Sequence, residues 1–248
     1  KTKFDTGGIA DTSSETSDKT ENEKKINYMD IFVHIAPLIC LITIYFNETS
    51  FVGMFRIIEN DKKLEILLIT QTMRWWGKNV NIETLKDLIN IYIKHMADDK
   101  EIAQIIRTVK ELFIKNIDNQ KTLGELIDKY FIPQESERKN DAEVSTPSAL
   151  RKNMLDTVPI EVWSSICRVC DPCCGKGGIL VDIIDRFMLG LREKIPDKEK
   201  RYKTIVENCI YFIDINPTNI FICKLLINRN KKYELNYHEG NTLDLDIK

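Results

Sequence analysis

Residues 165–191 constrain the fold most, because they predict a β-strand, a glycine turn and an α-helix in direct succession. Residues 165–170 are a short run with Val and Ile, and Asp171-Pro172 ends it. After the glycines, apolar residues recur in adjacent pairs at four-residue steps: Ile179, Leu180, Ile183, Ile184, Phe187, Met188 and Leu191. That spacing predicts a helix with a broad apolar face. A glycine turn before a helix start lets the main chain approach a ligand closely, so the unit predicts a nucleotide-type pocket.

Two better-known phosphate loops do not fit this turn. The pattern GxxxxGK[ST] is absent, since Gly177 follows Lys176. The pattern GxGxxG is met only at Gly175 and Gly177. ATP hydrolysis and dinucleotide binding are therefore disfavoured.

The cysteines before the turn have a second interpretation. Cys167, Cys170 and Cys173 have a CxxCxxC spacing, which could ligate zinc or an iron–sulfur cluster. However, Cys167 and Cys170 would point to opposite faces of a strand, and no second Cys or His pair follows at a suitable spacing. Small apolar cysteines in a crowded strand are the favoured interpretation, and no metal is expected.

A second strand is predicted at residues 209–213, and it ends at Asp214. In doubly wound sheets, an acid at this place accepts hydrogen bonds from a ribose hydroxyl pair. Its separation from the glycine turn exceeds the usual ~20 residues. The charged residues 192–203 are therefore interpreted as an insertion or a lengthened crossover.

The changing pattern along the chain predicts two domains. Residues 1–25 are polar and predict a disordered tail. Residues 26–132 have mostly helical apolar spacing, and 133–141 are a charged linker. From residue 142 to 248, short β-branched runs, the third at 233–237, alternate with helical patterns, which predicts an α/β domain built on a parallel sheet.

Composition restricts the setting of the protein. The formal charge is −2, which gives no global positive field for nucleic acid, and the seven cysteines are poor material for a disulfide framework. An intracellular protein is expected, in the cytoplasm or associated with DNA. The apolar run 31–46 is shorter than the ~20 residues of a membrane span, so it is expected in the core. Trp75-Trp76 lies among cations and could stack on bases, but core tryptophans at a helix end are favoured.

Four stretches together resemble the N6-adenine DNA methyltransferases, especially the methylation subunits of type I restriction-modification systems. DPCCGKGGIL at 171–180 is similar to the S-adenosylmethionine-binding motif of that family. EVSTP at 143–147 resembles the segment that closes over the methionine end of the cofactor. FIDINP at 212–217 and GNTL at 240–243 resemble the second-strand and third-strand motifs, in family order. The preceding helices resemble the helical domain of those subunits.

The resemblance implies a Rossmann-like methyltransferase sheet, incomplete in this sequence, that binds S-adenosyl-L-methionine. Asp171 and the 173–178 backbone would hold the methionine and central parts, Asp214 the ribose and Asn241 the adenine edge. The segment at 146–147 would form a lid. The cofactor-binding residues implied are Thr146, Pro147, Asp171, Pro172, Cys173, Cys174, Gly175, Gly177, Gly178, Asp214 and Asn241.

The family's catalytic loop, (Asn/Asp)-Pro-Pro-(aromatic), is absent from the sequence, so no catalytic residue is assigned. Asn216-Pro217 is a near-match, but it is interpreted as the start of a helix. In family order the loop would come shortly after Asp246. The expected function is a site-specific DNA adenine-N6 methyltransferase, present here as a portion that is inactive alone. Double-stranded DNA is the expected substrate. The expected partners are specificity or restriction subunits, or further copies of the same chain.

Two other functions stay open. One is a non-catalytic cofactor-binding or assembly subunit, which the absent catalytic loop motivates. The other is a methyltransferase that acts on RNA or protein, because a cofactor site does not define the acceptor.

Overall fold

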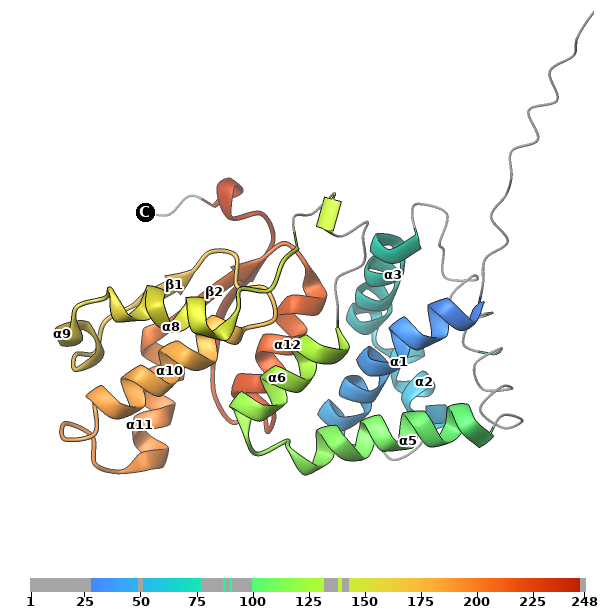
Figure 1. Ribbon diagram of the computed structural model, residues 1–248, viewed down its shortest axis with the longest axis horizontal. Helices are drawn as coiled ribbons and strands as arrows, with labels where there is room; N and C mark the ends of the chain where they lie inside the picture. Colours follow the sequence, from blue (N-terminus) through green and yellow to red (C-terminus); the bar gives the residue numbers. More distant parts are fainter. Residues whose placement is uncertain are drawn as a thin grey trace, which may run out of the picture.

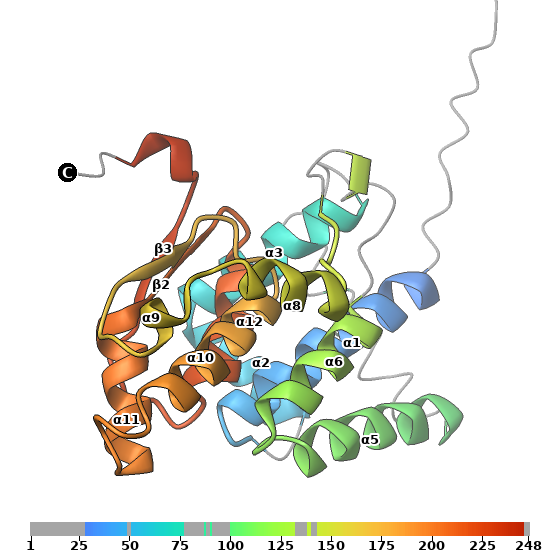
Figure 2. The ribbon, with the colours of Figure 1, turned by 60° about the vertical axis from the view of Figure 1, so that its left-hand side comes forward.

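The computed structural model describes residues 28–48, 51–76, 87, 90, 100–131, 138–139 and 143–245. Its helices and strands are, in chain order, α1 (Tyr28–Tyr45), α2 (Phe51–Asn60), α3 (Lys62–Trp76), α5 (Lys100–Lys115), α6 (Gln120–Tyr130), α8 (Ser148–Asp156), α9 (Ile160–Trp163), β1 (Val169–Asp171), α10 (Gly178–Gly190), α11 (Lys198–Thr204), a π-helical turn (Ile205–Cys209), β2 (Ile210–Asp214), α12 (Pro217–Asn228), β3 (Asn236–Glu239) and a 3₁₀ turn (Thr242–Asp244). Figure 1 shows helices α1, α2, α3 and α5 at one end and α8 to α11 with the sheet at the other. Figure 2 shows α9, α11 and the strands on the side away from α5.

The three strands form one parallel sheet in the order β1-β2-β3. Val169 pairs with Ile210 at the start of β1, and Asp214 pairs with Glu239 at the end of β2. Parallel neighbours need long crossovers, and α10 and α12 supply them. The protein is therefore a mixed α/β fold with a small parallel sheet, which confirms the coarse class predicted from the sequence.

The strand–turn–helix unit forms in the predicted order, with β1 followed by the glycine turn and α10. The strand is shorter than the predicted run at 165–170 and ends one residue further along, since β1 covers only Val169–Asp171. The lengthened crossover contains α11 and the π-helical turn. The predicted third strand is misplaced, because β3 begins at Asn236 rather than at residue 233. The reason lies in α12: the Asn228 carboxamide oxygen accepts hydrogen bonds from the N–H groups of Lys232 and Tyr233. These bonds keep residues 232–233 in the turn after the helix.

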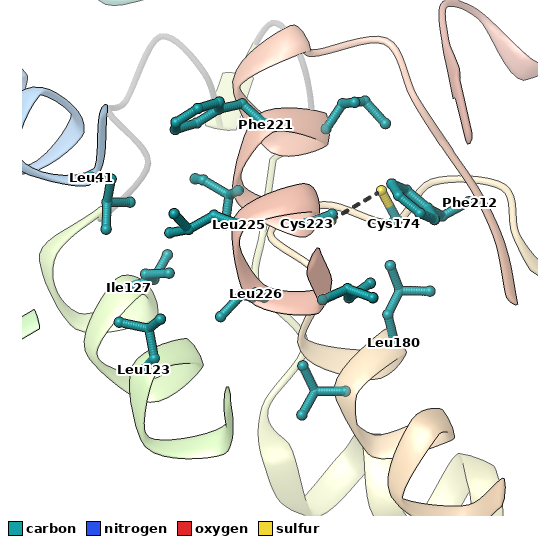
Figure 3. Close-up of a cluster of buried hydrophobic side chains, with 14 of the residues drawn as sticks. Leu41, Leu123, Ile127, Cys174, Leu180, Phe212, Phe221, Cys223, Leu225 and Leu226 are labelled. Atoms are coloured by element: carbon teal, nitrogen blue, oxygen red, sulfur yellow. Dashed lines mark hydrogen bonds between the residues drawn. The ribbon is translucent and has the colours of Figure 1, made fainter. Parts of the chain in front are cut away.

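Helix α12 is the centre of the hydrophobic core (Figure 3). Leu41 of α1, with Leu123 and Ile127 of α6, lies on one side of it, and Leu180 of α10 and Phe212 of β2 lie on the other. All these side chains are at most 1% exposed and belong to one continuous cluster. The helical part therefore packs directly on the α/β part. The predicted boundary at 133–141 falls largely outside the described residues and stays a prediction.

The apolar run at 31–46 lies mainly in α1, where residues 38–42 are almost completely buried. The predicted core role is confirmed for these five positions. No helix in the described part of the chain combines the length and apolarity needed to cross a membrane. Trp75 and Trp76 end α3, but their side chains, like the predicted tail at 1–25, lie outside the described residues.

Candidate functional site

The glycine turn and Asp214 meet at the carboxyl ends of β1 and β2. The Cys174 N–H donates to the Ile213 carbonyl at 2.9 Å, and the Gly175 N–H donates to Asp214 Oδ2 at 2.8 Å. These two bonds fasten the turn to the end of the neighbouring strand. The sequence predicts that both features belong to one cofactor site, and the structure brings them into direct contact.

The turn needs glycine at two positions. Gly175 and Gly177 have φ values of +50° and +80°. This is a left-handed backbone conformation that is unfavourable for residues other than glycine. At Gly177, which caps α10, an added Cβ would also lie 2.9 Å from Cys223 Sγ of α12. Gly177 therefore permits close packing of α10 against α12, whereas a Cβ at Gly175 would meet no atom within 4 Å.

Hydrogen bonds from nearby residues use most of the accepting capacity of the Asp214 carboxylate. It is 8% exposed, and its Oδ1 accepts hydrogen bonds from the Asn216 N–H at 2.8 Å and from the Asn219 carboxamide at 3.3 Å. Asn216 in turn caps α12 and Pro217 is its first residue, which confirms the predicted helix start. Asp214 thus organises the glycine turn and the β2–α12 turn, and its proposed ribose contact stays a prediction.

A hollow of about 240 Å³ lies beside the turn. Its wall combines both charges: the carboxylates of Asp128, Glu143 and Asp171 and the cations Arg151 and Lys176. The apolar part comes from residues such as Met154 and Ile179. A wall of mixed sign suits a ligand group that itself carries both charges.

Six of the eleven residues that the resemblance implies line the hollow: Thr146, Asp171, Cys173, Cys174, Gly175 and Gly178. The other five lie outside its wall: Pro147, Pro172, Gly177, Asp214 and Asn241.

The residues outside the wall have structural contacts of their own. Pro147 precedes the first residue of α8, and the Pro172 carbonyl accepts a hydrogen bond from the Thr242 hydroxyl. The Asn241 side chain is exposed and accepts a hydrogen bond from the Leu243 N–H, which caps the 3₁₀ turn. Thr242 therefore fixes the segment after β3 against the glycine turn.

Glu143 and Lys176 form a partly buried ion pair across the hollow. Lys176 Nζ lies 3.1 Å from Glu143 Oε1, and the two side chains are 9% and 13% exposed. The other carboxylate oxygen of Glu143 accepts a hydrogen bond from the Asn216 carboxamide at 3.3 Å and lies 3.8 Å from Arg74 of α3. Glu143 thus joins the helical part, the glycine turn and the β2–α12 turn.

Arg151 of α8 fixes another part of the wall. Its guanidinium donates to Asp182 at 2.7 Å and to the Thr146 carbonyl at 2.8 Å, and it lies 4.0 Å from Asp128. It also packs on Gly178, where an added Cβ would lie 2.9 Å from its Nη1. Arg151 therefore holds the segment before α8 against the first turn of α10.

Asp171, at the end of β1, has a raised pKa. Burial is the main cause, and the nearby Asp214 carboxylate adds to it, while the hydrogen bond from the Cys173 N–H acts in the opposite direction. Ionised Asp171 is therefore under-compensated by the protein. A cationic ligand group in the hollow would stabilise its charge.

Cys174 and Cys223 pack against each other behind the turn, with their Sγ atoms 3.6 Å apart (Figure 3). The Cys223 thiol also donates to the Gly175 carbonyl at 3.4 Å. The hydrogen bond between the two thiols, together with burial, raises the pKa of Cys174 far above its usual value. Cys174 therefore stays a thiol, and both cysteines have a packing role. The described residues contain no cluster of three metal-ligating side chains.

Sequence reasoning did not assign four charged residues of the hollow: Asp128, Glu143, Arg151 and Lys176. Lys176 had a local signal, because a cation inside a glycine turn is placed beside whatever the turn binds. Glu143 begins a segment already singled out, but its pairing spans 33 residues. A comparison with protein-family models found no match, and comparisons with curated proteins and with solved structures found none either.

Proposed function

We propose that the chain forms a Rossmann-like S-adenosyl-L-methionine-binding module of an N6-adenine DNA methyltransferase that acts on double-stranded DNA. One observation carries this proposal: the glycine turn after β1 and Asp214 at the end of β2 meet at the carboxyl edge of a parallel sheet, beside a hollow. Ligands of open α/β sheets bind in the crevice outside the carboxyl ends of the strands. The acceptor, adenine in DNA, rests on the resemblance of the four motifs.

The sheet order supports this assignment. The sequence β1-β2-β3 across the sheet corresponds to the first half of a doubly wound sheet, whose order is 3-2-1-4-5-6. In such sheets the first strand leads into the glycine turn and the second strand carries the acid for the ribose. Val169–Asp171 and Ile210–Asp214 occupy these two places.

The hollow fits one end of the cofactor. Its volume of about 240 Å³ is below the ~300–1,000 Å³ of pockets that enclose a whole ligand. Its mixed charges suit the amino-acid end, which carries an ammonium and a carboxylate next to the sulfonium. The ribose and adenine would extend along the sheet edge toward Asp214 and Asn241. S-adenosylmethionine supplies an electrophilic methyl group, while the residues described here bind and orient the molecule.

The replacement Asp171→Asn is expected to weaken S-adenosylmethionine binding by roughly ten- to a hundredfold, since a charge-assisted contact contributes about 1.5–3 kcal/mol. Isothermal titration of the 248-residue chain measures this. Asp244→Asn, an exposed acid in the 3₁₀ turn, is the matched control and should bind normally. Absence of binding by the folded wild-type chain would contradict the proposal.

The same replacement is expected not to lower stability at pH 7. Because the folded-state pKa of Asp171 is raised, the folded protein binds this proton more tightly than the unfolded chain does. Ionised Asp171 therefore lowers the folding stability at pH values above its folded-state pKa. This unfavourable contribution disappears as the pH falls below the pKa of Asp171 in the unfolded chain. Urea unfolding should therefore show Asp171→Asn at least as stable as wild type at pH 7, with the difference shrinking in acid. The expectation is contradicted if Asp171→Asn is less stable than wild type at pH 7 and this deficit is smaller in acid.

A second function stays open, because a cofactor site alone does not establish methyl transfer. In that case the chain binds the cofactor and assists assembly without transferring the methyl group. A transfer assay with methyl-labelled cofactor and adenine-containing duplex, performed on the protein made from the full coding region, separates the two. Incorporation of label into DNA supports the enzyme, whereas tight cofactor binding without incorporation supports the assembly subunit.

A further inference from the structure

The main-chain donors at the start of the glycine turn are already used. The N–H groups of Cys173, Cys174 and Gly175 donate to Asp171, Ile213 and Asp214. A ligand anion in the hollow therefore cannot rely on these three groups. The cationic side chains of the wall are the remaining charged donors among the described residues that line the hollow.

Of the two cations in the wall, Arg151 is already committed. Its Nε donates to Asp182, its Nη1 donates to the Thr146 carbonyl, and it packs on Gly178. Lys176 differs, because among the described residues it pairs with one carboxylate, that of Glu143, whereas Arg151 lies against both Asp182 and Asp128. Glu143 accepts one of the three donor protons of the Lys176 ammonium group. Its side chain is only 9% exposed, so a further bond to it would form with little competition from water.

Glu143 keeps this ammonium in place. Its other oxygen, Oε2, accepts a hydrogen bond from the Asn216 carboxamide and lies 3.8 Å from Arg74. A lysine side chain that would otherwise rotate freely is therefore pre-oriented on the wall of the hollow. Pre-orientation lowers the entropy that binding must overcome.

We infer that Lys176 is a specificity-determining residue that binds a free carboxylate group of the ligand, with Glu143 as its positioning partner. The inference rests on the proposed function and deepens it: the ligand is an adenosyl compound with an intact α-amino-acid end. Lys176 takes the carboxylate, and the acid side of the wall, Asp171 and Asp128, takes the ammonium or sulfonium. A ligand that lacks the carboxylate would leave Lys176 without its anion.

The test compares two adenosyl ligands on the 248-residue chain by isothermal titration. S-adenosylmethionine has the carboxylate, whereas decarboxylated S-adenosylmethionine has the ammonium and sulfonium only. Wild type is expected to prefer the first by roughly tenfold or more, as a charge-assisted bond implies. In Lys176→Met the ratio of the two affinities should fall close to one. Lys200→Met, an exposed lysine of α11, is the matched control and should keep the wild-type ratio.

Further variants keep the test decisive. Lys176→Arg keeps the cation and should retain part of the preference. This variant can be measured even if Lys176→Met fails to fold. Glu143→Gln removes the positioning charge and should reduce the preference without abolishing it. A preference that survives unchanged in both Lys176 variants overturns the inference, while cofactor binding by wild type still supports the proposed function. If wild type binds neither ligand, the proposed function fails, and this inference fails with it.

Discussion

Gly177→Ala is expected to destabilise the protein by about 2–4 kcal/mol. A residue other than glycine held at positive φ costs about 1–3 kcal/mol, and forcing extra volume into a packed core costs a similar amount. Both effects apply at this position, where φ is +80° and the new Cβ would lie 2.9 Å from the buried Cys223 Sγ. Urea unfolding of the variant and of wild type measures the difference.

A double-mutant cycle separates the two effects. In a Cys223→Ala background the close contact disappears, and the next neighbours of the added Cβ lie at 3.6 Å or more. The cost of Gly177→Ala should then fall by about 1 kcal/mol or more, leaving the backbone strain. Gly124→Ala is the control: it lies inside α6 and meets no atom within 4 Å, so it should stabilise by about 0.5–1 kcal/mol. An equal cost of Gly177→Ala in both backgrounds would show that packing against α12 plays no part.

The parts of the fold that the sequence predicted are those fixed by local chemistry. Paired apolar residues at four-residue steps specify α10, because the period itself defines the helix. Asn216-Pro217 specifies the start of α12, because a capping side chain and a fixed φ act within a few residues. The end of β2 at Asp214 belongs to the same class, since an apolar run stops there.

The parts that the sequence did not predict depend on contacts between distant segments. Lys176 reaches Glu143, and Arg151 reaches Asp182, only after α8 packs beside α10. The hydrogen bond from Gly175 to Asp214 spans 39 residues. Periodicity contains no information on such pairs, so the sequence predicts a ligand contact for Asp214 but not its role in holding the turn. The charge pattern of the hollow was missed for the same reason.

Asp214→Ala is expected to destabilise the protein by about 3–5 kcal/mol, because a buried donor left without its acceptor costs about 1–3 kcal/mol. The replacement removes the acceptor for the N–H groups of Gly175 and Asn216 and for the Asn219 side chain. Denaturant unfolding should show a lower midpoint. Asp214→Asn should recover only part of the loss, because its amide N–H₂ would face one of these donors.

Glu239→Ala is the matched control for Asp214→Ala. Glu239 pairs with Asp214 across the sheet and is exposed, so its removal should change stability by at most about 0.5 kcal/mol. A stability of Asp214→Ala close to that of Glu239→Ala would contradict the turn-holding role. If Asp214→Ala unfolds as expected, its loss of cofactor binding reports the collapse of the turn and cannot serve as evidence for a ribose contact.

The ribose contact therefore has to be tested on the ligand. A carboxylate has roughly four lone-pair sites, and Asp214 already accepts two bonds on Oδ1 and one on Oδ2. Room is left for one ribose hydroxyl rather than for the pair. On wild-type protein, we expect one of the 2′-deoxy and 3′-deoxy analogues of S-adenosylmethionine to bind roughly tenfold more weakly than the parent and the other to bind nearly as well. Equal large losses for both analogues would mean that Asp214 gives up an internal bond when the cofactor binds, and no loss for either would exclude it as the ribose acceptor.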